Sequence, residues 1–321
     1  MEEEKLKNIL RKYMLPEEVD KAILKIHEIN NLKKEKNAVI LGHNYMTPDV
    51  YYGVSDYTGD SLALAQSAAK TKADIILFNG VYFMAETAKI LNPTKKVLIA
   101  DPNAGCSLSE SITGDEVLDF KKKNPGVPVV TYINCSAEVK AAADIVCTSS
   151  NAVKVVNSIK EESVYLIPDG FLAQNVQKST DKKILYWNGK CMVHELFSEM
   201  DVSMARKNFP GVKVVAHPEC KPEVTKVSDY TGSTSQIQDY IHNEHPEKVL
   251  LLTECSMGEN IKGENDDVDF VSTCQVCPHM QKITLDGVLH SLQSESYEVE
   301  VSENIRIDAE KSLRKMLEIG R

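Results

Sequence analysis

The chain has 321 residues, 42% of them hydrophobic and 26% charged, with a formal net charge of −10 at pH 7. A chain of this length exceeds what one hydrophobic core usually supports, so we expect two or three packed units. The negative charge argues against nucleic acid or an anionic membrane as the main partner, since both require a basic surface.

Segments that direct or anchor the chain to a membrane are not expected. The N-terminal residues lack a basic region followed by an apolar one, which a signal peptide would need. No apolar run approaches the roughly 18 residues that span a bilayer. We therefore expect a cytoplasmic protein.

In chain order, residues 1–36 are expected to be helical because their apolar residues recur at helical spacing. A continuous apolar run then ends at Gly42, which is typical of a parallel strand buried on both faces. Strands and helices alternate from there to Cys106, and the helices begin near Ser61 and Phe83. The three strands expected in this part are residues 38–41, 74–78 and 96–100.

The same alternation recurs twice. The pentapeptide Ser-Asp-Tyr-Thr-Gly occurs at position 55 and again at 228, and Asp56, Asp144 and Asp229 begin equivalent segments at nearly equal intervals. This period exceeds that of solenoid repeats and fits a small βαβαβ domain. The later strands are expected at residues 129–133, 164–167, 183–186, 212–216, 248–253 and 268–271, with helices at 152–159 and 236–242.

The fold class that follows is α/β. We expect three three-layer αβα units with small parallel sheets, related by a pseudo-threefold axis, with the active site at their common centre. The units are expected to cover residues 1–108, 109–193 and 194–285. The tail contains an amphipathic helix, and we expect the C-terminal helices, residues 286–321, to pack on the first unit as a cap.

Polar and reactive residues follow the strands in matched sets. In parallel α/β sheets, ligands gather beyond the carboxyl ends of the strands, beside helix N-termini. Hydroxyl and backbone N–H groups there can bind a carboxylate or phosphate, although each Ser or Thr could equally be an N-cap alone. The first strands lead to His43 and Tyr45, to Tyr132 and Asn134, and to His217 and Glu219; the helix starts carry Ser61, Ser149, Ser233 and Thr234.

Three of the eight cysteines, Cys106, Cys191 and Cys277, follow the third strands at nearly equal intervals along the chain. In a cytosolic chain, dispersed cysteines indicate metal or cluster ligands, or small core residues, rather than a disulfide framework. Three converging thiolates without a fourth favour a [4Fe–4S] cluster with one open iron over structural zinc. Such an iron acts as a Lewis acid, so dehydration chemistry is expected.

A rival interpretation takes Cys274 and Cys277 as a CxxC pair for zinc or redox chemistry. No second CxxC completes a zinc site, so the cluster is favoured. The remaining cysteines are interpreted as small core residues: Cys135, Cys147, Cys220 and Cys255.

A series of motifs stands in order over nearly the whole chain. The motifs are His43-Asn44-Tyr45, Gly59-Asp60-Ser61-Leu62, Phe83-Met84-Ala85-Glu86, Tyr132-Ile133-Asn134, Cys147-Thr148-Ser149-Ser150-Asn151-Ala152, Cys191-Met192-Val193-His194, His217-Pro218-Glu219-Cys220, Gly232-Ser233-Thr234 and Leu289-His290-Ser291-Leu292-Gln293-Ser294-Glu295-Ser296. They resemble the quinolinate synthase family of de novo NAD biosynthesis. The resemblance implies condensation of iminoaspartate (iminosuccinate) with dihydroxyacetone phosphate to quinolinate, with release of phosphate and two waters.

The resemblance also implies an oxygen-sensitive [4Fe–4S] cluster on Cys106, Cys191 and Cys277. Some family members carry a longer cysteine-rich motif around the last ligand. This chain has only Cys274 and Cys277 there, which speaks against redox regulation by a disulfide at that point. By analogy with the family, an aspartate oxidase or aspartate dehydrogenase would supply the iminoaspartate.

Roles for individual side chains follow from the same resemblance. Glu219 is expected to transfer protons, with Tyr45 as a second acid–base group and His43 beside it, because burial near a cluster can tune such groups. His194 would lie near the open iron and polarise substrate oxygens. The dicarboxylate would bind through His43, Ser61, Tyr132, Asn134, Ser149, His217, Glu219 and Thr234.

Two other functions stay open at this stage. A hydro-lyase acting on a different hydroxy acid would use the same open iron, and it differs in not requiring both a phosphate and a dicarboxylate. A cluster- or zinc-based redox sensor that binds a metabolite would not need Glu219, Tyr45 and His43 together. A sensor usually adds a module that reads DNA or binds a partner, and none is found in the sequence.

Overall fold

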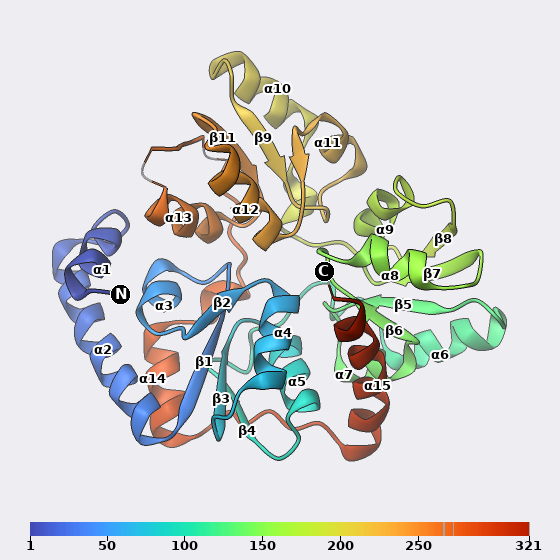
Figure 1. Ribbon diagram of the computed structural model, residues 1–321, viewed down its shortest axis with the longest axis horizontal. Helices are drawn as coiled ribbons and strands as arrows, with labels where there is room; N and C mark the ends of the chain where they lie inside the picture. The colour runs from blue at the N-terminus through green and yellow to red at the C-terminus, as the bar shows by residue number, and fades with distance from the viewer. Residues whose placement is uncertain (266, 272, 321) are drawn as a thin grey trace. The chain divides into compact units, whose positions relative to one another are not determined.

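The computed structural model describes residues 1–265, 267–271 and 273–320 (Figure 1). Within them, three four-stranded parallel sheets are formed. The first sheet has the order β2 (Tyr57–Gly59), β1 (Ala38–His43), β3 (Ile75–Asn79), β4 (Lys96–Ile99). The second has β6 (Ile145–Cys147), β5 (Val129–Tyr132), β7 (Ser163–Ile167), β8 (Lys183–Tyr186), and the third has β10 (Tyr230–Thr231), β9 (Lys213–Ala216), β11 (Lys248–Leu252), β12 (Asp269–Val271).

The same strand order therefore occurs three times, and the predicted fold class, α/β with three flanked parallel sheets, is confirmed. We call the segment that carries each sheet a repeat. The helices are α1 (Glu3–Leu10), α2 (Pro16–Glu35), α3 (Pro48–Gly53), α4 (Ser61–Lys70), α5 (Tyr82–Leu91), α6 (Gly114–Lys123), α7 (Ala137–Ala142), α8 (Ala152–Ser158), α9 (Gly170–Gln177), α10 (Glu199–Asn208), α11 (Pro222–Val227), α12 (Thr234–Glu244), α13 (Cys255–Glu264), α14 (Leu285–Ser294) and α15 (Glu303–Ile319). Short 3-10 helices lie at His194–Leu196 (η1) and Met280–Lys282 (η2).

By its contacts, the chain forms two compact units. Unit 1 comprises Met1–Ala104, Cys255–Glu264 and Val276–Glu300, and it contains the first sheet. Unit 2 comprises Gly105–Glu254, Asn265–Gln275 and Val301–Arg321, and it contains the second and third sheets. The arrangement of three α/β units around a common centre, and their boundaries, stay predictions.

The central strands are buried because their sequences are continuously apolar. Ile40 and Leu41 of β1 are fully buried, as are Val214 and Val215 of β9. Removing such a side chain from water stabilises the fold by about 1.5–3 kcal/mol. The edge strands β2, β6 and β10 were not predicted, because they are only two or three residues long.

An aspartate ties the amino-terminal edge of each sheet in the same way. Its carboxylate accepts a hydrogen bond from a backbone N–H of the first strand, and its own N–H donates to the carbonyl of that same strand residue. The pairs are Asp56 with Ile40, Asp144 with Val129 and Asp229 with Val214, and the distance from carboxylate oxygen to backbone nitrogen is 2.8 Å in all three.

A cation earlier in the chain, at the same sequence separation from the aspartate in all three repeats, completes this tie, which we call the aspartate clamp. Each cation also donates to the carbonyl two residues before the aspartate. Lys33, Lys121 and Arg206 lie 2.8, 2.8 and 3.2 Å from Asp56, Asp144 and Asp229. The clamps bind Ile40, Val129 and Val214, so these strand residues are equivalent in the three repeats. Counting onward from them, Tyr45 is equivalent to Asn134 and Glu219. In the same way, His43 is equivalent to Tyr132 and His217.

Of the C-terminal helices expected to cap the first unit, α14 packs in unit 1 as expected, but α15 does not. In unit 1, α14 packs against α2 and β4, but in unit 2, α15 packs against α7 and β6 (Figure 1). The reason is the apolar stripe of α15, whose buried members Ala309, Leu313 and Met316 recur at helical spacing. The hydroxyl of Ser312 adds a 2.7 Å hydrogen bond to the carbonyl of Lys140 in α7.

Candidate active site

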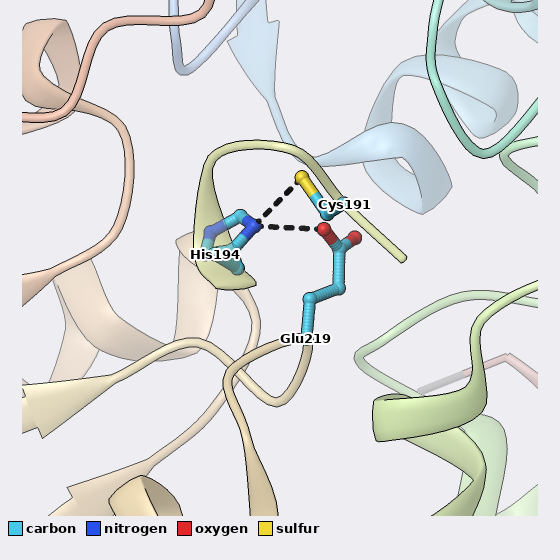
Figure 2. Close-up of side chains that lie close together, drawn as sticks. All are labelled: Cys191, His194 and Glu219. Atoms are coloured by element: carbon cyan, nitrogen blue, oxygen red, sulfur yellow. Dashed lines mark hydrogen bonds and ion pairs between the residues drawn. The ribbon is translucent and has the colours of Figure 1, made fainter. Parts of the chain in front are cut away.

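Three side chains of unit 2 form the centre of the candidate site. Figure 2 shows His194 reaching both Cys191 and Glu219. Its Nδ1 lies 3.1 Å from Cys191 Sγ and 2.8 Å from Glu219 Oε2. The three donor atoms lie within 4.8 Å of one another, which is a spacing suited to a metal ion. His194 and Glu219 are buried and Cys191 is half-buried.

The loop after β8 positions Cys191 and His194. Gly189 pairs with Asp169 at the end of β7, and its carbonyl accepts a 2.9 Å hydrogen bond from Gly170. A Cβ on Gly189 would lie 2.5 Å from the carbonyl oxygen of Pro168, so only glycine allows this approach. Cys191 follows two residues later. Its carbonyl accepts a 3.0 Å hydrogen bond from the N–H of Glu195, which belongs to η1.

The carboxylate of Glu219 is held by groups from two repeats. Tyr132 OH donates to Glu219 Oε1 at 2.5 Å, and His217 Nδ1 lies 3.9 Å from the same oxygen. Burial disfavours the charged form, but the nearby His194 and His217 charges and the hydrogen bonds from His194 and Tyr132 outweigh it, so the pKa of Glu219 lies below its ordinary value. The structure therefore holds a buried, ionised carboxylate.

His194 is fixed from its other side as well. Its Nε2 lies 2.9 Å from Thr253 Oγ1, and its ring stacks on His217 with centroids 4.7 Å apart. A partner on Nε2 sets the ring orientation and leaves Nδ1 facing the thiol and the carboxylate. Thr253 was not predicted, because it lies 59 residues from His194 and no local motif marks it.

A second buried carboxyl, that of Asp169, stands near Glu219 and was also missed by the sequence analysis. Its Oδ1 accepts from the backbone N–H groups of Phe171 and Leu172 at 2.8 and 3.0 Å, so it caps α9. Burial and the charge of Glu219 raise the pKa of Asp169 well above its ordinary value. The pKa values of the two carboxyls are thus shifted in opposite directions, upward for Asp169 and downward for Glu219. The only sequence signal was an aspartate at a helix start.

The loop of Cys106 is tied to the loop of Cys191 by one side chain. Ser107 Oγ donates to the carbonyl of Lys190 and accepts from Met192 N, both at 3.2 Å. Burial, then the charges of Glu219 and Cys106, raise the pKa of the Cys191 thiol. Neighbouring thiols in such a place resist ionisation unless a cation stabilises the thiolates. The donor set of Cys106 and Cys191 therefore fits a metal or a metal cluster.

Cys277, the third predicted ligand, belongs to unit 1 and is a reduced thiol. Its carbonyl accepts a hydrogen bond from the N–H four residues later, as do those of Cys106 and Cys191, at 3.1, 3.0 and 3.0 Å. The three cysteines thus share one local structure. Their convergence on one cluster stays a prediction.

Two predicted residues of unit 1, His43 and Tyr45, contact each other. Tyr45 N donates to His43 Nδ1 at 3.2 Å, and their rings pack edge to face with centroids 4.7 Å apart. The equivalent pair in the third repeat repeats the backbone contact, since Glu219 N lies 3.4 Å from His217 Nδ1. The backbone of Tyr45 and that of Glu219 therefore have the same local geometry.

The predicted hydroxyls at helix starts are not the caps of their helices, with one exception. Asp60 caps α4 by accepting from Ala63 N at 2.9 Å, and Ser233 caps α12 by accepting from Gln236 N at 3.3 Å. Ser61 and Thr234 follow these caps as first helical residues. The alternative interpretation as N-caps is therefore wrong for Ser61 and Thr234. It is right that Ser233 is an N-cap.

Of two further predicted residues, Ser149 lines a cavity and Asn134 has a buried oxygen without a partner among the described residues. Ser149 lines a cavity of about 1120 Å³ in unit 2, together with Pro218, which immediately precedes Glu219. The cavity also carries Lys154, Lys178 and Lys226, which make it a locally basic pocket in an acidic protein. Asn134 Oδ1 is buried and has no hydrogen-bond partner among the described residues, so a ligand donor would complete it.

The other cysteines correct part of the sequence interpretation. Cys135, Cys147 and Cys220 are fully buried reduced thiols, as predicted for core residues. Cys255 is only half-buried and, like Cys274, is disulfide-bonded, so its interpretation as a core thiol is wrong. Since Cys277 is reduced, the CxxC pair is not joined in this structure.

Comparisons with known proteins show which family this chain resembles. The family model described as "Quinolinate synthetase A protein" matches residues 27–318. The chain is 51% identical over 294 residues to a quinolinate synthase of Xylella fastidiosa, covering 92% of this chain and 87% of that protein. It is 52% identical to the quinolinate synthase of Sinorhizobium fredii, covering 92% and 82% of the two chains, and 50% identical to that of Caulobacter vibrioides, covering 92% and 81%. Among the described residues, no helix is both long and apolar enough to cross a bilayer.

Proposed function

The chain belongs to the quinolinate synthetase A family, and on this premise we propose that it is a quinolinate synthase of de novo NAD biosynthesis. It condenses iminoaspartate (iminosuccinate) with dihydroxyacetone phosphate and releases quinolinate, phosphate and two waters, in the cytoplasm. An aspartate oxidase or aspartate dehydrogenase supplies the iminoaspartate. The observation that carries the proposal is the buried cluster of Cys191, His194 and Glu219 in a chain matched over residues 27–318.

We propose that Cys106, Cys191 and Cys277 hold a [4Fe–4S] cluster. The tie through Ser107 between the first two cysteine loops, and the equivalent local structure of the third, support this assignment. When bound, such a cluster supplies a Lewis acid at the iron that no cysteine holds. His194, whose Nδ1 lies 3.1 Å from Cys191 Sγ, would orient substrate oxygens when the cluster is bound.

Glu219 acts as the principal acid–base group. Its carboxylate is ionised in the resting protein, so it accepts a proton from the substrate and later returns it. Tyr132 OH and His194 Nδ1 hold the two carboxylate oxygens and fix their direction. Because Glu219 and His194 are buried, water does not compete for the transferred proton.

Tyr45 serves as the second acid–base group, supported by His43. The dicarboxylate is bound by the hydroxyls and amides at the strand ends and helix starts, which supply neutral donors without adding charge. The binding residues are His43, Ser61, Tyr132, Asn134, Ser149, His217, Glu219 and Thr234. The lysines of the cavity that Ser149 lines favour an anionic substrate in this region.

The test begins with anaerobic purification and analysis of iron and sulfide. We expect about four irons per chain, and quinolinate formed only when both iminoaspartate and dihydroxyacetone phosphate are supplied. Cys191→Ala should lose iron and product together. Cys147→Ala is the matched control, because Cys147 is a fully buried reduced thiol at the end of β6 and should keep both.

Other outcomes would overturn the proposal. Zinc in place of iron, with no product under strict anaerobiosis, would favour the metabolite-binding sensor. Iron with turnover of a hydroxy acid, and no need for dihydroxyacetone phosphate, would favour the hydro-lyase.

A further inference from the structure

Two asparagines at equivalent helical positions each hold a turn that follows a first strand. Asn175 is the sixth residue of α9, and Asn260 is the sixth residue of α13, one repeat later in the chain. In unit 2, Asn175 Nδ2 donates to the carbonyls of Pro218 and Cys220, both at 2.8 Å. These two residues flank Glu219.

Asn260 makes the same pair of bonds in unit 1. Its Nδ2 donates to the carbonyl of Asn44 at 3.1 Å and to that of Met46 at 2.8 Å. These two residues flank Tyr45. Glu219 and Tyr45 are equivalent, since each lies five residues after a strand residue bound by an aspartate clamp.

The chemistry of the contacts fixes the orientation of Asn175. Its Oδ1 accepts from Thr225 Oγ1 at 2.7 Å and from Lys178 Nζ at 2.9 Å. Since a lysine ammonium can only donate, the oxygen must face Lys178 and the NH₂ group must face the two carbonyls. Both donors of the amide are therefore used to hold the turn.

The equivalent helix of the first repeat, α5, lacks this arrangement. The sixth residue of α5 is Thr87, whose hydroxyl donates to the carbonyl of Phe83 in its own helix at 2.9 Å. The turn that carries Asn134 is held by a different bond, from Lys140 Nζ to the carbonyl of Cys135. The asparagine is thus present for the two turns whose central side chain can transfer a proton, and absent for the turn whose central side chain is an amide.

We propose that Asn175 and Asn260 are positioning residues that fix the two acid–base side chains, Glu219 and Tyr45, by binding the carbonyls on either side of each. The roles of Glu219 and Tyr45 rest on the proposed function, whereas the hydrogen bonds do not. A turn held at both flanking carbonyls cannot rotate its central residue. A displacement of about 1 Å at a reacting group can lower a rate by about 10²-fold.

The variants Asn175→Asp and Asn260→Asp keep the side-chain size and replace the NH₂ donor by an oxygen that faces two carbonyl oxygens. The matched control is Asn92→Asp. Asn92 Nδ2 also donates to two carbonyls, those of Ala68 and Ala88, both at 3.0 Å, but it holds no strand-end turn. All variants are compared as anaerobically purified holoenzyme, with metal content and melting temperature recorded.

The first measurement is hydrogen–deuterium exchange of the peptides that cover residues 43–46 and 217–220. It reads the amides of Met46 and Cys220, which donate to the His43 and His217 carbonyls at 3.0 Å. Asn175→Asp should speed exchange about tenfold or more at Cys220 alone, and Asn260→Asp at Met46 alone. Asn92→Asp should change neither. Equal acceleration in the control, or unchanged exchange in the turn that faces the variant, would overturn the proposal.

The second measurement is steady-state kinetics. Each positioning variant should lower kcat by about 10- to 10²-fold with KM changed less than threefold and metal content unchanged. A loss of melting temperature without a loss of kcat would mean that the asparagines act in stability alone. If no quinolinate forms with any variant or the wild type, the proposed function fails while the exchange result still decides the positioning role.

A milder variant keeps the test open if Asn175→Asp does not fold. Thr225→Val removes the 2.7 Å bond to Asn175 Oδ1 with almost no change in shape. It should speed exchange at Cys220 by a smaller factor and leave Met46 unchanged. Acceleration at both amides, or at neither, would count against the proposal.

Discussion

The side chains of the three repeats are alike at the amino-terminal edge of the sheets and unlike at the carboxyl edge. At the amino-terminal edge, the aspartate clamps use the same acceptor, the same strand position and a cation at the same distance along the chain. At the carboxyl edge, the turns carry His43 and Tyr45, Tyr132 and Asn134, and His217 and Glu219. The amino-terminal edge therefore has equivalent side chains in all three repeats, whereas the side chains at the carboxyl edge differ between repeats.

The physical demand on each edge explains this difference. A backbone N–H at the start of a buried strand needs an acceptor, and the same acceptor serves in every repeat. A reaction centre needs groups of unlike acidity, so identical turns would be useless. The backbone of the carboxyl edge is nevertheless repeated, as the contacts of Tyr45 N with His43 and Glu219 N with His217 show. The scaffold is common and only its side chains differ.

Replacing the carboxylate of Glu219 by an amide should have the largest effect on activity. Glu219→Gln keeps the acceptor for Tyr132 but removes the charge that His194 and His217 face, so we expect kcat to fall by about 10²- to 10⁴-fold. The melting temperature should change little, because the side chain keeps its size. Anaerobic kinetics and a thermal scan of the same sample measure both. A variant that keeps kcat would remove Glu219 from the reaction.

Removing a carboxylate at the amino-terminal edge should lower stability and leave activity nearly unchanged. Asp144→Ala leaves the N–H of Val129 without its 2.8 Å acceptor and Lys121 without its carboxylate partner. We expect a loss of about 1–2 kcal/mol of stability, as for the loss of a helix cap, with kcat per folded molecule within twofold of the wild type. Denaturant unfolding and anaerobic kinetics check the two parts. A large fall in kcat would break the distinction between the edges.

The same distinction explains what could be predicted from the sequence. The recurrence of Asp56, Asp144 and Asp229 gave the repeat, because every copy makes the same local bond. Continuous apolar runs placed the long strands, for example 183–186 as found in β8. The edge strands such as β10, with two residues, carry no pattern of their own and form only beside an existing strand.

Contacts between distant residues limited the prediction of the site. Cys191 and Glu219 were named because their residue types stand where strands end, and His194 was named through the family resemblance. Asp169 and Thr253 were missed, since their importance comes from burial beside Glu219 and His194, which only the fold creates. The disulfide-bonded state of Cys255 likewise depends on a partner that no spacing rule singles out.

The clamps themselves should differ in strength according to the burial of their cations. The side chain of Lys33 is 10% exposed and also donates to the carbonyl of Val54 at 2.7 Å, whereas that of Arg206 is 45% exposed. Lys33→Met should therefore cost about 1–2 kcal/mol, because the buried carbonyl of Val54 loses its donor. Arg206→Met should cost less than about 1 kcal/mol, as for an exposed ion pair.

Unfolding of the two variants in parallel measures this difference, and a high salt concentration of about 1 M serves as a control. Salt should weaken the Arg206 contribution and leave most of that of Lys33, since screening acts mainly on exposed charges. Equal costs at both positions would show that the clamp strength is set by the aspartate alone.

The smallest effect is expected for the ion pairs of Glu295 in unit 1. Glu295, at the end of α14, accepts from Lys36 at 2.7 Å and from Lys96 of β4 at 2.5 Å. Hydrogen bonds from Lys36 and Lys96 lower the pKa of Glu295 to about 2. Because the folded-state pKa is depressed, the stabilisation is complete above the unfolded value of about 4.3 and is lost as the pH falls toward 2.

Glu295→Gln should therefore lower the melting temperature slightly at pH 7, and its difference from the wild type should shrink as the pH is lowered from about 4.5 to 3. The effect is small because the side chain is about a third exposed, and solvent screens the pair. Thermal scans of both proteins at each pH measure the difference, so that any acid sensitivity they share cancels. A difference that stays constant across this range would mean that Glu295 acts through packing of the α14 end and not through its charge.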